Sequence, residues 1–364
     1  MGANLLILFA TSFLVQLPPS LQPTPQHQQT DSLEPDERPV SGIGYERLSD
    51  ALAYDRVQGL SLGAGYRIPL AADAVVYATL RYGLSDERIT GRLSVVHQAA
   101  RARYTVSGYD DVSQVDPFAL GRSLSNSANA LFAGHDNGDY LLASGGAIGV
   151  ELELGPGLDL ALEGRVERES PVNRVAESEV NDFLGGSGRF PANPEVTEGT
   201  FAALSAGVRG LRRTRWEVAA DLVSGPGPAI PRIRGEVRRH LGPNRLVRVT
   251  AKTGIMTRPS HPQLLFRLGG VATVRGFEYG TVRARSFWAA QLDFAPLRGR
   301  IVPVLFLDAG QAAEPARLFS STALIGAGAG VSLLRGLVRL ELSRPLTPDI
   351  GGKIRFDLVV EGGR

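Results

Sequence analysis

Apolar and polar residues alternate along most of this sequence, and no other feature restricts its fold as strongly. Between residues 158 and 167 the even positions carry Leu, Gly or Val, whereas Asp, Glu or Arg occupies all but one of the odd positions. The same alternation recurs at 148–154, 282–294 and 353–361. Because successive side chains of a β-strand point to opposite faces, each segment predicts a strand with one apolar and one polar face.

About 15 such segments follow one another, and each is close to the length that a tilted strand needs to cross a membrane, roughly 9–11 residues. Their ranges are 59–68, 74–83, 88–97, 101–110, 140–154, 158–168, 199–209, 213–223, 229–240, 245–255, 282–295, 300–309, 323–334, 336–344 and 352–361. A closed bacterial barrel favours an even number of strands, so we expect one more strand at residues 40–48. The sequence therefore predicts an all-β protein, a transmembrane antiparallel β-barrel of 16 strands.

The connections between the predicted strands alternate in length. The short connections are 69–73, 97–101, 155–157, 210–213, 241–244, 295–300 and 335–336. The long connections are 111–139, 169–198, 256–281 and 310–322, and all of them fall on the other side of the sheet. Outer-membrane barrels have this asymmetry, with short periplasmic turns and longer outer loops. A soluble sheet protein is the alternative. Outer-membrane barrels carry girdles of aromatic residues at both membrane interfaces, and aromatic residues make up only 7% of this chain.

The composition excludes several classes of protein. Hydrophobic residues make up 43% of the 364 residues, and no apolar run after position 20 is long enough for a spanning helix, which excludes a polytopic helical membrane protein. The net charge is only +2 and the arginines are spread along the chain, so we expect no nucleic-acid partner. The chain has no cysteine and therefore no disulfide framework or thiolate metal site.

The N-terminal segment indicates export. Residues 5–15 form an apolar stretch of the length found in signal peptides, and a Pro-Pro pair follows shortly after it. We therefore predict a signal peptide at residues 1–20, a Pro- and Gln-rich linker at 21–39 and the transmembrane β-barrel at 40–364. The expected location is the outer membrane of a bacterial cell.

Three motifs lie in the last third of the chain. LGGVATVRGFEYG spans residues 268–280, FLDAG spans 306–310 and LVRLELSRPL spans 337–346. Together they resemble the bacterial surface antigen superfamily of 16-stranded outer-membrane barrels, which includes the barrel-assembly insertase and the two-partner-secretion translocators. The strand count places the first motif in the loop before strand 12 and the second on strand 13, where that family carries them.

The resemblance implies that the sixth outer loop folds back into the barrel lumen. It assigns to the loop motif Arg275, Gly276 and Phe277, and to the partner motif on the facing strand Phe306, Asp308 and Gly310. A guanidinium inside the lumen needs an acceptor, and Asp308 is the only charged residue in the apolar strand at 301–309. Family members often carry a Glu on strand 12, where this chain has Gln291 and Asp293, so we predict these two as secondary lumen partners.

No pattern in the sequence indicates an enzyme. The G-x-S-x-G elbow, the H-E-x-x-H motif and the P-loop are all missing. We therefore predict no catalytic residues, no metal site and no cofactor.

The resemblance implies a role in outer-membrane protein assembly or in translocation. The linker is too short to fold as a polypeptide-transport-associated domain, so we expect a barrel-only member of the superfamily. The expected partners are the lipid bilayer and either a substrate polypeptide or a separate periplasmic protein. A passive, porin-like diffusion channel and a surface structural or adhesion barrel are the alternatives.

Overall fold

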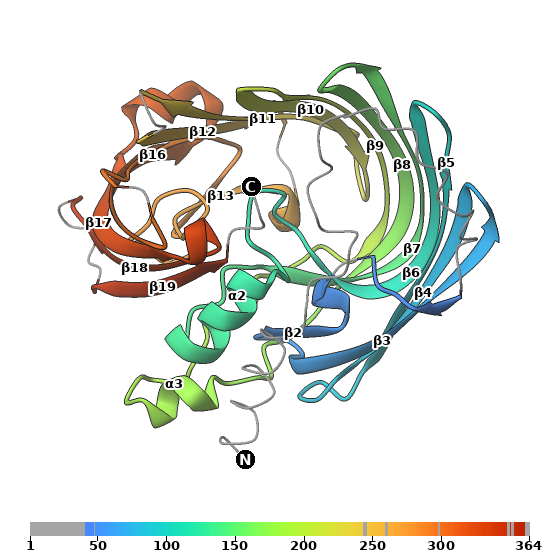
Figure 1. Ribbon diagram of the computed structural model, residues 1–364, viewed down its shortest axis with the longest axis horizontal. Coiled ribbons are helices and arrows are strands. Elements are labelled where there is room, and N and C mark those ends of the chain that lie inside the picture. Colours follow the sequence, from blue (N-terminus) through green and yellow to red (C-terminus); the bar gives the residue numbers. More distant parts are fainter. Residues whose placement is uncertain are drawn as a thin grey trace.

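The computed structural model describes residues 41–46, 48–242, 246–258, 261–297, 299–347, 350 and 353–360. In these ranges the chain forms one large antiparallel sheet that curves into a wall around an interior (Figure 1). The signal peptide and linker predicted for residues 1–39 lie outside the described residues. Among the residues described, no helix is both long enough and apolar enough to cross a membrane.

The main sheet has 17 strands, and two further strands form a separate hairpin. The main strands are β1 (Gly42–Ile43), β2 (Leu52–Asp55), β3 (Gly59–Ala71), β4 (Ala74–Gly83), β5 (Ile89–Gln98), β6 (Ala102–Gln114), β7 (Tyr140–Gly155), β8 (Leu158–Pro171), β9 (Gly199–Leu211), β10 (Thr214–Ser224), β11 (Ile230–Leu241), β12 (Val247–Met256), β15 (Ser286–Phe294), β16 (Ile301–Ala313), β17 (Leu324–Leu333), β18 (Val338–Pro345) and β19 (Arg355–Val360). The hairpin consists of β13 (Phe266–Leu268) and β14 (Val282–Ala284).

The strand count agrees with the sequence prediction. Because β1 and β2 both pair with β3, at different points along it, they share one position and the sheet has 16 positions. From β3 onward each strand of the sheet pairs antiparallel with the next one along the chain. The all-β fold and the alternation of short and long connections are thus confirmed.

Two predicted strands differ from the observed ones. The first strand was expected at 40–48, but its place is taken by β1 and β2 with the 3-10 turn η2 (Leu48–Asp50) between them. The ladder is interrupted there because Tyr45 turns its side chain into it and donates a hydrogen bond from its hydroxyl to the carbonyl of Gly63, at 3.1 Å. The strand expected at 282–295 is divided, because β14 pairs with β13 whereas β15 pairs with β12 and β16.

The two faces of the wall have different environments, as β16 illustrates. Alternate residues of β16 are buried on the inner face, and these are Val304, Phe306, Asp308, Gly310 and Ala312. The residues between them include Leu305 and Leu307, which are exposed on the outer face. An apolar exterior with a mixed interior is the arrangement of a transmembrane barrel.

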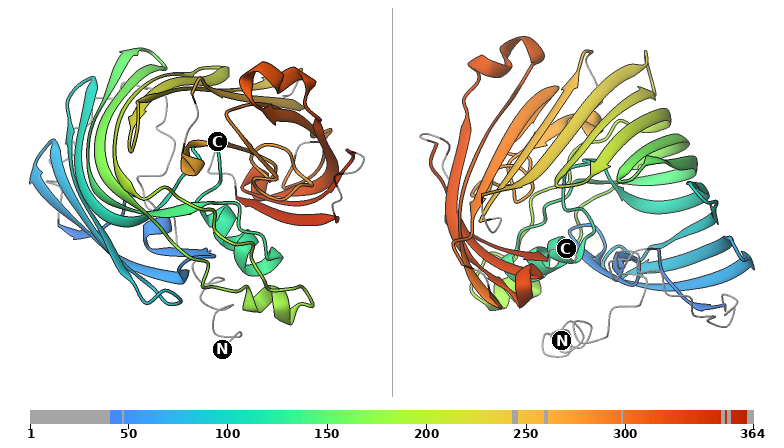
Figure 2. Two further views of the ribbon diagram at one scale, coloured as in Figure 1. Left: turned by 180° about the vertical axis from the view of Figure 1, so that it is seen from behind. Right: turned by 45° about the horizontal axis from the view of Figure 1, so that its top comes forward.

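Short helices occur only in the connections of the described chain. The loop between β6 and β7 contains α2 (Leu124–Ala128), which continues as the π-helical turn η3 (Asn129–Ala133). The loop between β8 and β9 contains α3 (Glu179–Phe183). The 3-10 turns η5 (Pro262–Leu264), η6 (Pro315–Ser320) and η7 (Leu334–Gly336) lie in later connections. Both views in Figure 2 place α2 close to the end of the wall formed by β19.

Adjacent residues on β9 provide a test of this two-faced wall. Leu204 is 66% exposed on the outer face, whereas Ser205 lines a lumen cavity of about 600 Å³. We expect Leu204→Arg to lower the free energy of unfolding by roughly 2–4 kcal/mol if the residue lies near the bilayer midplane. Ser205→Arg should cost much less, because the new charge would lie in an open polar cavity beside Glu163, its cross-strand neighbour on β8.

Urea titration of the protein in lipid vesicles, followed by tryptophan fluorescence, gives both values. Equal losses for the two variants would contradict a wall with one lipid face and one lumen face.

Candidate functional site in the barrel lumen

The connection between β12 and β15 folds into the interior of the barrel. It carries the hairpin of β13 and β14, which lies inside the ring of strands in Figure 1. Its side chains contribute to the main apolar cluster of the protein, which includes Leu268, Val274 and Phe277 together with Phe287 of β15. The inward-folded loop predicted from the sequence is therefore present.

Glycines let the loop approach the wall closely. Gly276 has a φ of +91°, a conformation that side chains resist, and a Cβ on it would lie 2.6 Å from the carbonyl carbon of Arg344. On the wall, a Cβ on Gly326 would lie 1.9 Å from the carbonyl oxygen of Arg275. A Cβ on Gly310 would lie 2.8 Å from Leu268. Larger residues at these wall positions would push the loop away from β16 and β17.

Arg275 binds Asp308 at three points. Its backbone N–H and its Nε donate to Oδ2 of Asp308 at 2.9 and 2.7 Å, and Nη2 donates to Oδ1 at 2.7 Å. The guanidinium also lies over the ring of Phe306, 3.8 Å from its centroid. Both Arg275 and Asp308 are buried, so the contact is desolvated and geometrically specific.

Two further carboxylates complete the environment of the guanidinium. Nη1 of Arg275 donates to Oδ1 of Asp293 at 2.8 Å and to Oε1 of Glu341 at 3.0 Å. Asp293 in turn accepts from Nε of Arg248 at 2.9 Å and from Nη2 of Arg339 at 3.0 Å. Arg339 also pairs with Glu341. The charges of these side chains balance within a network that joins the loop to β12, β15, β16 and β18.

The other predicted residues have separate contacts. Gln291 does not reach the guanidinium; its Nε2 donates to the carbonyl of Val271 at 3.0 Å and so holds the loop backbone. Phe277 is buried in the main apolar cluster. Sequence reasoning missed Glu341, Arg339 and Arg248, although the first two lie within the third motif, where charged residues alternate with leucines.

The buried charge of Arg275 is stable because its acceptors are close. Burial alone would disfavour the charged form, but the carboxylates of Asp308, Glu341 and Asp293 outweigh it and hold the pKa of the guanidinium well above its ordinary value. Removing one partner of such a buried pair lowers the free energy of unfolding by more than the intact pair contributes to it, because the other charge is left buried and uncompensated.

A second set of contacts ties the base of the loop to the β6–β7 connection. Nε of Arg267, on β13, donates to Oδ2 of Asp139 at 2.9 Å, and both side chains are fully buried. The hydroxyl of Tyr279 donates to Oδ2 of Asp116 at 3.1 Å. The loop is therefore held from the wall on one side and from another long connection on the other.

An open cavity of about 970 Å³ lies beside the Arg275 network. Its charged lining is mainly basic. The basic residues are Arg212, Arg213, Arg215, Arg238, Arg248, Lys252, Arg275 and Arg339, and the acidic ones are Glu236, Asp293 and Glu341. Within the described ranges, no group of three or more His, Cys, Asp or Glu side chains is arranged to hold a metal ion.

No protein-family model matches the sequence, and no curated protein matches it. Among solved structures, BamA from Haemophilus ducreyi lacking POTRA domains 1–3 is similar, with a TM-score of 0.56 and 13% identity over 84% of this chain and 68% of that chain. This chain has the fold of the BamA barrel. That fold is a bacterial outer-membrane β-barrel, in agreement with the resemblance of the three motifs.

CdiB structures give weaker similarity. CdiB from Acinetobacter baumannii matches with a TM-score of 0.46 and CdiB from Escherichia coli with 0.45, each at 14% identity. The matches cover 84% and 85% of this chain but only 57% and 61% of the CdiB chains.

A double-mutant cycle tests whether Arg275 and Asp308 act as one unit. We expect Arg275→Ala and Asp308→Ala each to lower the free energy of unfolding by about 3–5 kcal/mol, because each leaves a buried charge without its main partner. The double variant should lose clearly less than the sum of the two single losses.

The measurement is urea unfolding in lipid vesicles. Arg168→Ala is the matched control, since Arg168 pairs with Glu198 at an exposed site and its loss should cost at most about 1 kcal/mol. Additive losses in the cycle would show that the two residues stabilise the barrel separately.

Proposed function

We propose that this chain is an integral outer-membrane barrel that acts in the assembly or translocation of polypeptides, with its lumen closed in part by the loop that carries Arg275. The observation that supports this most strongly is the buried network that joins this loop to four strands of a BamA-type barrel. Such a network holds a loop in one position yet consists of polar contacts that water can replace when the loop moves.

The roles of the individual residues follow from their contacts. Arg275 anchors the loop, and Gly276 and Phe277 shape its approach and its apolar packing. On the wall, Phe306, Asp308 and Gly310 form the surface that receives it, while Asp293 supports the guanidinium and Gln291 supports the loop backbone. These side chains position the loop; none of them is proposed to carry out a reaction.

The proposed partners of the protein are the outer-membrane bilayer and a polypeptide in an extended or unfolded form. The apolar exterior of the barrel fits the bilayer. A separate periplasmic protein would then bring that polypeptide to the barrel. The similarity to BamA supports the fold, and the polypeptide substrate is inferred from the plugged lumen.

A passive diffusion channel is the second candidate, and the basic lining of the 970 Å³ cavity favours it. Basic side chains outnumber acidic ones in this cavity and attract anions, whereas the 600 Å³ lumen cavity is lined by more acidic than basic side chains. If the protein is a channel whose selectivity is set at the 970 Å³ cavity, its reversal potential in a potassium chloride gradient should show a preference for chloride.

Single-channel recording in a planar bilayer tests the proposed role of the loop. We expect the wild type to give small conductance and Arg275→Ala to give several-fold larger, unsteady conductance, because loss of the anchor lets the loop leave the lumen. Arg168→Ala should behave as the wild type does.

Folding of each variant is checked by its heat-modifiable mobility in gels. A folded Arg275→Ala protein whose conductance is unchanged would contradict the proposed role of Arg275 as the anchor that keeps the loop in the lumen. A large and steady conductance of the wild type would favour the diffusion channel.

A further inference from the structure

The helical segment of α2 and η3 lies between the first and the last strands of the sheet. In Figure 1 and in the left view of Figure 2, α2 occupies the space between β19 and β2. In the register, β19 pairs with β18 and β2 pairs with β3, so each of these strands has a second edge that faces the segment. The segment binds the edge of β19 through neutral side chains, whereas its contacts on the side of β2 include buried charged groups.

At the edge of β19, side chains of the segment make the hydrogen bonds that a neighbouring strand would make with its backbone. Ser125 Oγ accepts from the N–H of Val360 at 2.7 Å and donates to its carbonyl at 3.0 Å. The amide of Asn129 does the same for Leu358, accepting from its N–H through Oδ1 at 2.6 Å and donating from Nδ2 to its carbonyl at 2.8 Å. Both backbone groups of two edge residues are therefore bound by side chains.

The geometry of the two elements explains the match. Residues four apart on a helix share a face and are separated by about 6 Å along its axis. Alternate residues of a strand point their N–H and C=O groups to the same edge and are about 6.8 Å apart. Ser125 and Asn129 therefore reach Leu358 and Val360 with nearly the spacing of a β-ladder.

The opposite face of the helix binds β2. Ser127 lies two residues from Ser125, about 200° around the helix, and its Oγ accepts from the N–H of Tyr54 at 3.0 Å. Nearby, Asn126 donates to Oδ1 of Asp136 at 2.8 Å, and Oδ2 of Asp136 accepts from the backbone N–H of Arg56 at 2.8 Å. Nε of Arg56 lies 3.2 Å from the same carboxylate, and both side chains are buried.

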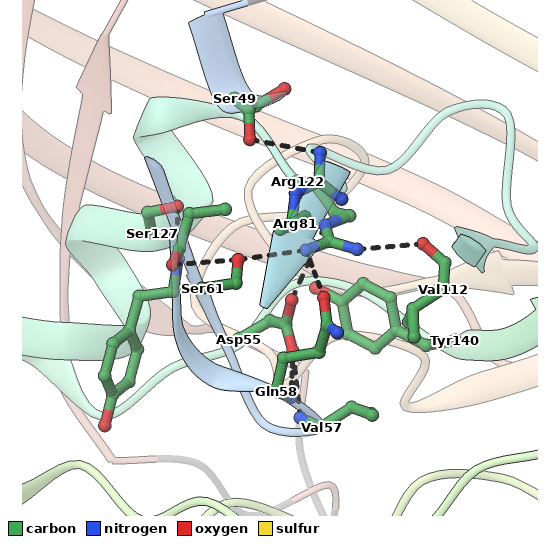
Figure 3. Close-up of polar contacts among 12 residues, drawn as sticks. Ser49, Asp55, Val57, Gln58, Ser61, Arg81, Val112, Arg122, Ser127 and Tyr140 are labelled. Carbon is green, nitrogen blue, oxygen red and sulfur yellow. Dashed lines mark hydrogen bonds and ion pairs between the residues drawn. The ribbon is translucent and has the colours of Figure 1, made fainter. Parts of the chain in front are cut away.

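Figure 3 shows a further group of polar contacts on this side. Arg122, just before α2, donates through Nη1 to the carbonyl of Val112 and through Nη2 to Ser61, and its Nε lies 3.6 Å from Oδ2 of Asp55. Oδ1 of Asp55 accepts from the N–H groups of Val57 and Gln58. These contacts fix the start of the segment to β2, β3 and β6.

The segment is thus held asymmetrically. Buried ion pairs and several charged hydrogen bonds join it to the β2 side. At β19 it is held by four hydrogen bonds from two neutral side chains, and next to it Nδ1 of His135 lies 3.6 Å from Oδ1 of Asp357. We propose that α2 and η3 form a latch. The segment stays bound to β2, covers the edge of β19 opposite β18, and keeps that edge from pairing with another strand. Release breaks the contacts to Leu358 and Val360 and leaves the contacts to Arg56 and Asp136 in place.

Amide hydrogen exchange of the full-length protein in lipid nanodiscs, resolved by residue, tests the latch. In the Ser125→Ala/Asn129→Ala variant we expect the amides of Leu358 and Val360 to exchange at least 10-fold faster than in the wild type. Alanine favours the helix more than Ser or Asn, so the substitutions remove the contacts without weakening α2. The amides of Asp357 and Val359 face β18 and should keep their protection.

Ser127→Ala is the matched control. It removes one serine from the same helix but acts on the other side, so it should speed the exchange of Tyr54 and leave Leu358 and Val360 unchanged. The proposal fails if Leu358 and Val360 exchange equally in the wild type and the double variant. It also fails if all amides of β19 speed up together, because the strand itself would then have melted. These readouts involve no conductance and do not depend on the function proposed above.

Discussion

The contact between Arg275 and its carboxylates sets the geometry around which the lumen is built. A buried guanidinium requires acceptors on several sides, and here they come from β15, β16 and β18. This requirement fixes the depth of the loop against the wall, because the backbone N–H of Arg275 binds the same carboxylate as its side chain. Gly326, which pairs with Asp308 in the register, provides the space in which the backbone of Arg275 lies.

Much of the wall follows from side-chain alternation alone. The even and odd positions of β8 differ so clearly that its start and its two faces can be predicted without any contact information, although the strand continues to Pro171, beyond the predicted end at 168. The broken first strand could not be predicted, because the position of Tyr45 depends on the carbonyl of Gly63, 18 residues away. Alternation describes which face a residue takes, but it contains no information on interruptions caused by distant partners.

The site was predictable to a lesser degree. Arg275 and Asp308 could be singled out because a motif resemblance and a lone charge in an apolar strand coincide. Glu341 carries no such signal, since it is one of two charged residues that alternate with leucines from 339 to 342 in β18. Its contact with Arg275 arises only when the sheet curves and brings β18 to the same side of the lumen as β15. The helical segment at 124–133 was likewise hidden, because its Ser and Asn residues are as typical of loops as of helices.

The number of strands that hold Arg275 has a consequence for the order of folding. Its acceptors are contributed by segments up to 66 residues away along the chain, and none of the three strands offers a complete site alone. Until β15, β16 and β18 have paired, a loop that entered the lumen would bring an uncompensated charge with it. We therefore expect the loop to dock only after β15, β16 and β18 have paired, while the lumen is still open.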